Sequence, residues 1–368
     1  MAEDAEEMHL PCYTEQIYGH GAAEHTFSDA FSSDRLQHAW LISGPRGIGK
    51  ASLAWKFAKF LLTQGSGTDA GLFGEPEPAP SATLDVDPNN PEVKRIAAGG
   101  HGGLLVVERS INEKTGQLRA DIVVQDIRRV NNFFAQTSAE GGWRVAIIDA
   151  ADEMNANAAN ALLKILEEPP EKSILLLVAH APGKLLPTIR SRCRTLKLNT
   201  LSEESVQAVL SARFPNLSDE EMLALARLSE GAPGRAVQMA LEDGVGLYRQ
   251  MGGLIADLPR LNVPAAHQLA VQLAAKNADA RYRLFIQIFT AWLERLIRQL
   301  ATQSAAQDIL QGESAQIARI SALAGVDRWI QLWEKVGQLV LRADAVNLDK
   351  KQVIISLLTG LAAVSRGQ

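Results

Sequence analysis

Short apolar runs alternate with longer amphipathic stretches through the first half of the chain. Four runs of mainly Val, Ile, Leu and Ala have the length of buried strands, at 39–43, 104–107, 144–148 and 174–179. Three stretches between them place apolar side chains at helical spacing, at 51–62, 122–134 and 155–168. Strands that alternate with helices predict a parallel sheet covered by helices, which is an α/β fold.

The pattern changes after residue 199, where strand-like runs give way to helical periodicity. Two short helices are predicted at 201–213 and 219–230, the second starting near an N-cap at Ser218. Two long amphipathic helices follow, whose apolar stripes indicate packing between helices; the stripes are Phe285, Ile288, Trp292 and Leu296, and Trp329, Leu332, Val336 and Leu339.

We therefore expect an α/β domain over 1–199, a small helical domain over 200–245 and an all-helical domain over 246–368. Within the first domain, residues 65–103 are expected to form an inserted loop, because their first part is rich in Gly, Pro, Ser and Asp.

A glycine-rich turn follows the first predicted strand and opens the first predicted helix. Its sequence, Gly44-Pro45-Arg46-Gly47-Ile48-Gly49-Lys50-Ala51, nearly matches the P-loop pattern. Gly44, Gly47 and Gly49 would let backbone N–H groups converge on phosphate oxygens at the helix N-terminus, and Lys50 would reach the β- and γ-phosphates. A purely structural glycine turn is the alternative.

The departures from that pattern concern the metal ion and the attacking water. Ala51 stands where a Ser or Thr hydroxyl holds Mg²⁺, and Ser52 lies about 100° further round the helix. Asp149 ends a predicted strand, as the Mg²⁺-positioning Asp of P-loop ATPases does, although a cap or turn residue is an equal alternative. The next residue is Ala150. We expect a weak or vestigial ATP site, with Mg²⁺ only if ATP binds, and little or no hydrolysis.

Composition narrows the cellular setting. The formal net charge of −5 gives no overall attraction to nucleic acid. The two cysteines, Cys12 and Cys193, exclude a disulfide framework and a four-cysteine zinc site, and they fit a reducing compartment. The N-terminus is acidic without a signal-like apolar region, and apolar runs are too short to span a membrane. We expect a cytoplasmic protein with no membrane partner.

One stretch carries a more specific resemblance. Asn160-Ala161-Leu162-Leu163-Lys164-Ile165-Leu166-Glu167-Glu168-Pro169-Pro170, with Ser191-Arg192-Cys193, His38-Ala39 and Asn347-Leu348-Asp349, resembles the bacterial clamp-loader family, the gamma/tau and delta-prime subunits of DNA polymerase III. The resemblance covers essentially the whole chain. It implies an AAA+ fold, with a RecA-like parallel sheet, a helical lid and an all-α C-terminal collar. It also implies gamma/tau and delta as partners, and the sliding clamp and primed DNA reached through the complex.

Within that family the departures resemble the delta-prime type, the ATPase-deficient member of a hetero-oligomeric ring. They are Ala51, Ala150 and the lack of Thr in Val178-Ala179-His180-Ala181-Pro182. The preserved glycines and Lys50 leave residual nucleotide binding open. The zinc module common in the family cannot form here, and His101 in its place is expected to be a loop residue.

Two arginines are candidates for contact with phosphate. By resemblance Arg192 is a trans arginine finger, which projects into the neighbouring subunit's nucleotide site; a basic surface cluster with Arg190 and Arg194 is the alternative. Arg235, near the start of a lid helix, could contact nucleotide in cis, or could be a salt-bridged residue at the helix N-terminus.

Two other functions are possible for a chain with these motifs. The first is a working gamma-type ATPase. The second is another P-loop class, such as a small-molecule kinase, which the helical second half and Ser191-Arg192-Cys193 disfavour.

Overall fold

The computed structural model describes residues 10–64, 84–112, 114–135, 142–303, 307–346 and 348–367. The chain forms two compact units, one of Met1–Val209 with Gly231–Arg235 and one of Leu210–Glu230 with Ala236–Gln368. The boundaries expected at 199 and 245 remain predictions. Asn347, part of the expected family resemblance, and the start of the expected insertion lie outside the described residues.

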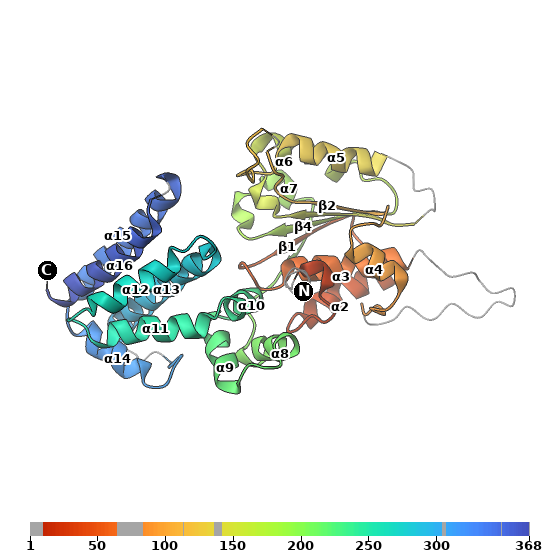
Figure 1. Cartoon of the computed structure of the whole chain (residues 1–368). Coiled ribbons are helices and arrows are strands. Elements are labelled where there is room, and N and C mark those ends of the chain that lie inside the picture. The colour runs from red at the N-terminus through yellow and green to blue at the C-terminus, as the bar shows by residue number, and fades with distance from the viewer. Residues whose placement is uncertain are drawn as a thin grey trace. The chain divides into compact units, whose positions relative to one another are not determined.

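A five-stranded parallel sheet forms the first unit (Figure 1). Its strands run in the order β2-β3-β4-β1-β5. The four predicted strands are confirmed, as β1 (Ala39–Ser43), β2 (Leu104–Val107), β3 (Arg144–Asp149) and β4 (Ser173–Ala179). The fifth, β5 (Arg194–Lys197), was not predicted, because Leu196 is its only buried side chain.

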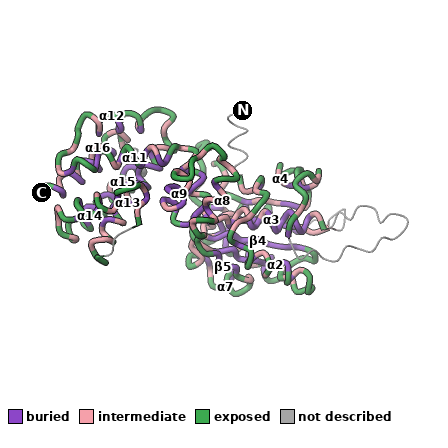
Figure 2. The backbone as a smooth tube through the Cα atoms, turned by 90° about the horizontal axis from the view of Figure 1, so that it is seen from below, coloured by how far each residue is buried: buried purple, intermediate pink, exposed green. Residues whose placement is uncertain are grey.

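Alternating side chains of β1 divide the core into two layers. Trp40 and Ile42 pack with α2 (Gly21–Ser32) and α3 (Lys50–Thr63) on one face of the sheet. Ala39 and Leu41 pack on the other face with α5 (Val124–Ala135) and α6 (Ala156–Glu167) (Figure 1). β1 and β4 are buried along their whole length, and β3 is buried except at its two end residues (Figure 2). This sheet, covered by helices on both faces, confirms the predicted α/β P-loop class.

The expected loop over 65–103 needs one correction. Residues 91–97 form the helix α4 (Pro91–Ala97), which buries Val93 and Ile96. Pro91 occupies the first turn, and the Asn90 side chain accepts a hydrogen bond from the Glu92 N–H. Proline is favourable at the start of a helix as well as in turns, so its presence at residue 91 is compatible with both. A helix this short gives little periodicity in the sequence.

After β5, every regular element among the described residues is a helix, as expected. The N-cap at Ser218 is confirmed, with Glu221 completing a capping box. The predicted apolar stripes are buried except Leu339, which is partly exposed. The helices are α8 (Glu203–Arg213), α9 (Asp219–Leu228), α10 (Pro233–Leu241), α11 (Gly244–Ala256), α12 (Val263–Leu273), α13 (Asp279–Thr302), α14 (Glu313–Ser321), α15 (Val326–Val346) and α16 (Lys350–Ser365).

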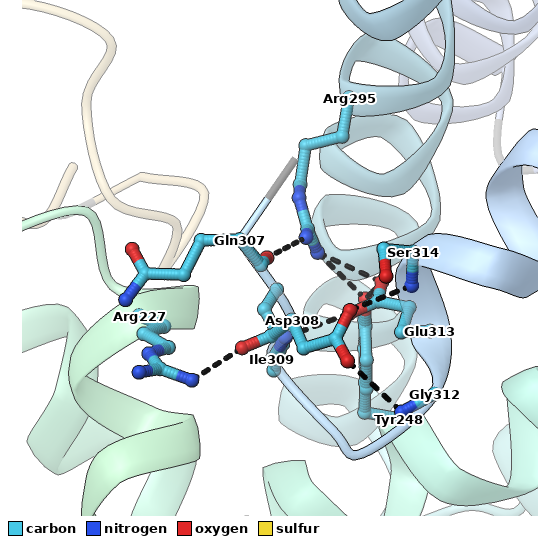
Figure 3. A network of polar contacts seen from close by, with 9 residues as sticks. All are labelled: Arg227, Tyr248, Arg295, Gln307, Asp308, Ile309, Gly312, Glu313 and Ser314. Atoms are coloured by element: carbon cyan, nitrogen blue, oxygen red, sulfur yellow. Dashed lines mark hydrogen bonds and ion pairs between the residues drawn. The ribbon is translucent and has the colours of Figure 1, made fainter. Parts of the chain in front are cut away.

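A buried polar network joins three helices of the second unit (Figure 3). Glu313 accepts hydrogen bonds from the Tyr248 hydroxyl and, at 2.8 Å, from Arg295 Nη1. Its other oxygen accepts from the Ile309 N–H at 2.9 Å. Burial and the neighbouring Glu313 carboxylate raise the pKa of Tyr248 far above its ordinary range. The network fixes the loop before α14 against α11 and α13.

Among the described residues, none of the helices combines the length and apolar character needed to cross a membrane.

Candidate functional site

The predicted P-loop connects β1 to α3. Gly44, Gly47 and Gly49 all have positive φ angles, of 150°, 77° and 96°. A side chain at Gly44 would place its Cβ 2.5 Å from the Leu198 carbonyl oxygen, so glycine is required there. His20 also supports the loop, because its Nε2 lies 2.6 Å from the Ile48 carbonyl oxygen and its ring is buried. Nothing in the motif identified His20, which lies 28 residues earlier in the chain.

Lys50 turns back onto its own loop. Its Nζ donates to the carbonyl oxygens of Gly44 at 2.8 Å and Pro45 at 2.5 Å, and the residue is only 3% exposed. Burial lowers the pKa of Lys50 to about 8, although the carboxylates of Asp149 and Asp152 oppose the shift. Two of the three N–H groups of the ammonium are therefore used within the loop itself.

The side chains beside Lys50 offer little to a metal ion. The Ala51 side chain carries no oxygen, and the Ser52 hydroxyl is hydrogen-bonded to the Thr14 hydroxyl at 3.1 Å. Asp149 ends β3, and its pKa is raised to about 6, chiefly by burial and also by Glu108. Asp149, the carboxylate predicted to position Mg²⁺, therefore lies at the end of β3 as expected.

The carboxylates after Asp149 are committed elsewhere. Asp152, in the 3-10 helix η2 (Ala151–Glu153), accepts from the backbone N–H groups of His180 at 2.8 Å and Ala181 at 2.9 Å. Burial alone would raise the pKa of Asp152, but these two hydrogen bonds hold it below its ordinary value. Glu153 is ion-paired with Arg46 of the P-loop at 2.6 Å and with Arg109 at 2.9 Å.

His180 directly follows β4, within the segment 178–182 in which the gamma-type members of the family are expected to carry a threonine. Burial lowers its pKa to about 4, with help from the Lys50 and Arg46 cations and against the effect of Asp152. The imidazole is therefore neutral at pH 7. Among the described residues its Nδ1 is buried without a hydrogen-bond partner.

The start of α10 lies directly against the P-loop. The Gly234 N–H donates to the Gly47 carbonyl at 2.7 Å, and a Cβ at Gly47 would lie 3.1 Å from the Arg235 nitrogen. The helix begins at Pro233, two residues before the expected start at Arg235. The structure thus brings the Arg235 backbone to the phosphate loop, and its side chain is half-buried.

His101, expected to be a loop residue, lies 3.2 Å from Glu92 and accepts a hydrogen bond from the Gly103 N–H.

Arg192 lies at the opposite edge of the sheet from the P-loop. It precedes β5, whose first residue, Arg194, is paired with Trp40 near the start of β1. The P-loop follows the other end of β1. One strand of this length separates the two edges by about 13 Å. The two sets of predicted site residues are therefore not brought together within one chain.

The Arg192 side chain is on the surface, 37% exposed. It follows α7 (Pro187–Arg190), a short helix anchored by Ile189, which is fully buried. Of the flanking arginines, Arg190 is exposed, while the Arg194 guanidinium lies over the Trp40 ring, 4.7 Å from its centre. Burial raises the pKa of the neighbouring Cys193 to about 12, so its thiol stays protonated.

Known proteins resemble this chain in sequence. A family model described as DNA polymerase III, delta subunit, matches residues 19–202, which is half of the chain. DNA polymerase III subunit delta' of Pseudomonas aeruginosa is 34% identical over 61% of this chain and 61% of its own length. The Bacillus subtilis subunit delta' is 32% identical over 56% and 59%. The Escherichia coli subunit tau is 30% identical over 61% of this chain and 30% of its own.

These matches reach about three fifths of the length of the delta' relatives. Among solved structures, a DNA polymerase III gamma subunit-related protein of Thermotoga maritima aligns over 93% of this chain and 100% of its own, with 17% identity and a TM-score of 0.44.

Proposed function

This chain belongs to the family described as DNA polymerase III, delta subunit, and from that membership we propose that it acts as the delta-prime-type subunit of a clamp loader. In this role it joins gamma/tau and delta subunits in a cytoplasmic ring and presents Arg192 to a neighbour's ATP. It thereby helps to open the sliding clamp and place it on primed DNA. It hydrolyses little or no ATP itself.

The observation that carries the proposal is the placement of Arg192. The Arg192 guanidinium is exposed after a short helix anchored by buried Ile189, and the P-loop of the same chain lies at the other edge of the sheet. In this position the guanidinium can contact only a nucleotide phosphate that is bound to another subunit. A guanidinium supplied in trans stabilises the charge that develops on the γ-phosphoryl oxygens, and it can increase the rate by about 10³–10⁵.

The chain's own phosphate loop supports the ATPase-deficient part of the proposal. Lys50 is hydrogen-bonded to its own loop, and Asp152 is hydrogen-bonded to the backbone. The side chains of Ala51 and Ala150 supply no oxygen. The charge around the P-loop does not favour binding of a nucleotide polyphosphate either, because carboxylates offset its cations. The cations are Lys50, Arg46 and Arg109, and the carboxylates are Asp149, Asp152, Glu153 and Glu108.

The intersubunit surface we propose is an exposed apolar stripe on α15. Ile330, Trp333 and Leu341, with Gly337 between the last two, share one helix face by their spacing. Trp333 is 41% exposed and Leu341 73%. Large apolar side chains aligned on one exposed face are typical of protein interfaces. This stripe is the part of the second unit that best fits a collar between subunits.

The decisive experiment is reconstitution with gamma/tau and delta subunits, with ATP hydrolysis measured in the presence of clamp and primed DNA. Arg192→Ala should lower hydrolysis and clamp loading severely, whereas Arg190→Ala, a change of an exposed arginine two residues away, should have little effect. Hydrolysis that is unchanged by Arg192→Ala would refute the proposal. Equal losses for both variants would favour a basic surface cluster instead.

A working gamma-type ATPase is the second candidate, favoured by the intact glycine pattern and Lys50. The isolated chain distinguishes the two functions. We expect no Mg²⁺-dependent ATP turnover above background, and no change with Lys50→Ala. Steady turnover that disappears in Lys50→Ala would identify the chain as an ATPase in its own right.

A further inference from the structure

The carboxylate of Glu167 holds the Arg192 guanidinium. Glu167 is the last residue of α6, and its Oε1 lies 2.9 Å from Arg192 Nη2. Arg192 Nη1 donates to the Thr188 carbonyl in α7 at 3.1 Å. The guanidinium is therefore held by one anionic and one neutral contact, which come from two separate segments of the chain.

The position of Glu167 is electrostatically unfavourable without a cation nearby. A carboxylate in the last turn of a helix meets the negative end of the helix dipole. Arg192 offsets this effect. The Glu167 side chain is 51% exposed, however, and an exposed ion pair contributes little to stability. The main consequence of the pair is that it restricts the rotamers of a long, flexible arginine side chain.

The contacts also leave the guanidinium able to bind an anion. A guanidinium has five N–H groups, and these two contacts use one on each terminal nitrogen. The remaining N–H groups can donate to phosphate oxygens while the carboxylate stays in place. Orienting a catalytic cation before the phosphate arrives lowers the cost of reaching the transition state.

We propose that Glu167 is the positioning residue for Arg192, which fixes the orientation in which the guanidinium meets a neighbouring subunit's phosphate. This inference rests on the proposed trans role of Arg192 and adds the residue that makes the side chain ready for it. Glu167 touches neither nucleotide nor reacting atoms in this role. It acts only through the guanidinium.

The test uses the full chain reconstituted with its partner subunits, clamp and primed DNA. The measured quantity is the Arg192-dependent part of ATP hydrolysis, which is the rate of the wild type less that of Arg192→Ala. Glu167→Ala should lower the kcat of this part about three- to tenfold with the KM for ATP unchanged. Glu167→Gln keeps an acceptor oxygen and should retain more activity. Glu168→Gln removes the adjacent exposed charge and should leave the rate unchanged.

A double replacement separates positioning from a general effect on the fold. In the Arg192→Ala background, Glu167→Ala should cause no further loss, because its target is gone. The thermal midpoint of Glu167→Ala should match that of Glu168→Gln. If Arg192→Ala has no effect on hydrolysis, the proposed function itself fails. If Arg192→Ala is severe but Glu167→Ala is silent, raises the rate, or adds to Arg192→Ala, only the positioning role is overturned.

Discussion

Replacing Asp149 by Asn should stabilise the folded chain above pH 6. Burial at the end of β3, with repulsion from Glu108, raises the pKa of Asp149 from 3.8 to about 6. An acid with a higher pKa in the folded state than in the unfolded state weakens the fold as the pH rises between the two values. Asparagine has nearly the same shape and no charge, so it removes this cost.

The size of the effect follows from the two pKa values. The folded pKa of about 6 exceeds the ordinary 3.8 by about two pH units, and one unit corresponds to about 1.4 kcal/mol. The ionised carboxylate therefore costs up to about 3 kcal/mol above pH 6 and almost nothing near pH 4. Local relaxation on replacement makes a gain of about 1–3 kcal/mol the expected range at pH 7.5.

Asp152, three residues later, provides a matched control of opposite sign. Its two backbone hydrogen bonds lower its pKa, so the charged form stabilises the fold above the ordinary pKa and this stability is lost in acid. Asp152→Asn should therefore destabilise the chain at pH 7.5, by about 1–3 kcal/mol.

Urea unfolding of the wild type and both variants between pH 4.5 and 8 measures the differences, and amide hydrogen exchange of β3 peptides localises them. The Asp149→Asn gain should grow from pH 4.5 to about pH 6, the folded pKa of the wild-type carboxylate, and stay level above it. A gain that does not change with pH, or the same sign for both variants, would refute the reasoning.

Two further predictions concern the second unit. Glu313→Ala should cost about 3–5 kcal/mol in urea unfolding, because it leaves the Arg295 side chain, which is only 13% exposed, without its anion. A cost no larger than that of Asp243→Ala, which breaks the more exposed pair with Arg281, would contradict this. Replacing both Trp333 and Leu341 by Glu should weaken binding to the partner subunits at least about tenfold, measured by light scattering on mixed subunits. Ile111→Glu, at an exposed apolar position in the first unit, is the control, and an equal loss there would exclude the α15 stripe as the interface.

The sequence predicted those elements whose burial leaves a regular pattern of apolar residues. The strand at 174–179 is apolar throughout because β4 is buried on both faces, and the helix at 155–168 was predicted from the helical spacing of its apolar residues. β5 was missed because an edge strand with two charged residues has no apolar run. α4 was missed because seven residues make too few turns for a periodic pattern.

The chemistry around the site was less predictable, because it depends on contacts between distant residues. The motif indicated Lys50 but not its hydrogen bonds to backbone carbonyls, which leave no trace in side-chain identity. Asp152 accepts from backbone groups 28 and 29 residues away, and His20 contacts the P-loop carbonyl of Ile48 over a separation of 28 residues. Glu167 and Arg192 were both within recognised motifs, yet their pairing required the fold.

The parallel pairing of β5 with β1 gives this subunit a direction. Its cation lies at the amino edge of the sheet and its phosphate loop at the carboxyl edge. Contacts that join one edge to the opposite edge of the next protomer are head-to-tail, so they build closed circles or open spirals and never a twofold dimer. In such an assembly, a member whose P-loop at the carboxyl edge is inactive can supply its cation to the nucleotide site of one neighbour. It cannot itself be activated by the cation of the other neighbour. One such member would therefore determine the subunit at which successive ATP hydrolysis around the ring begins or stops.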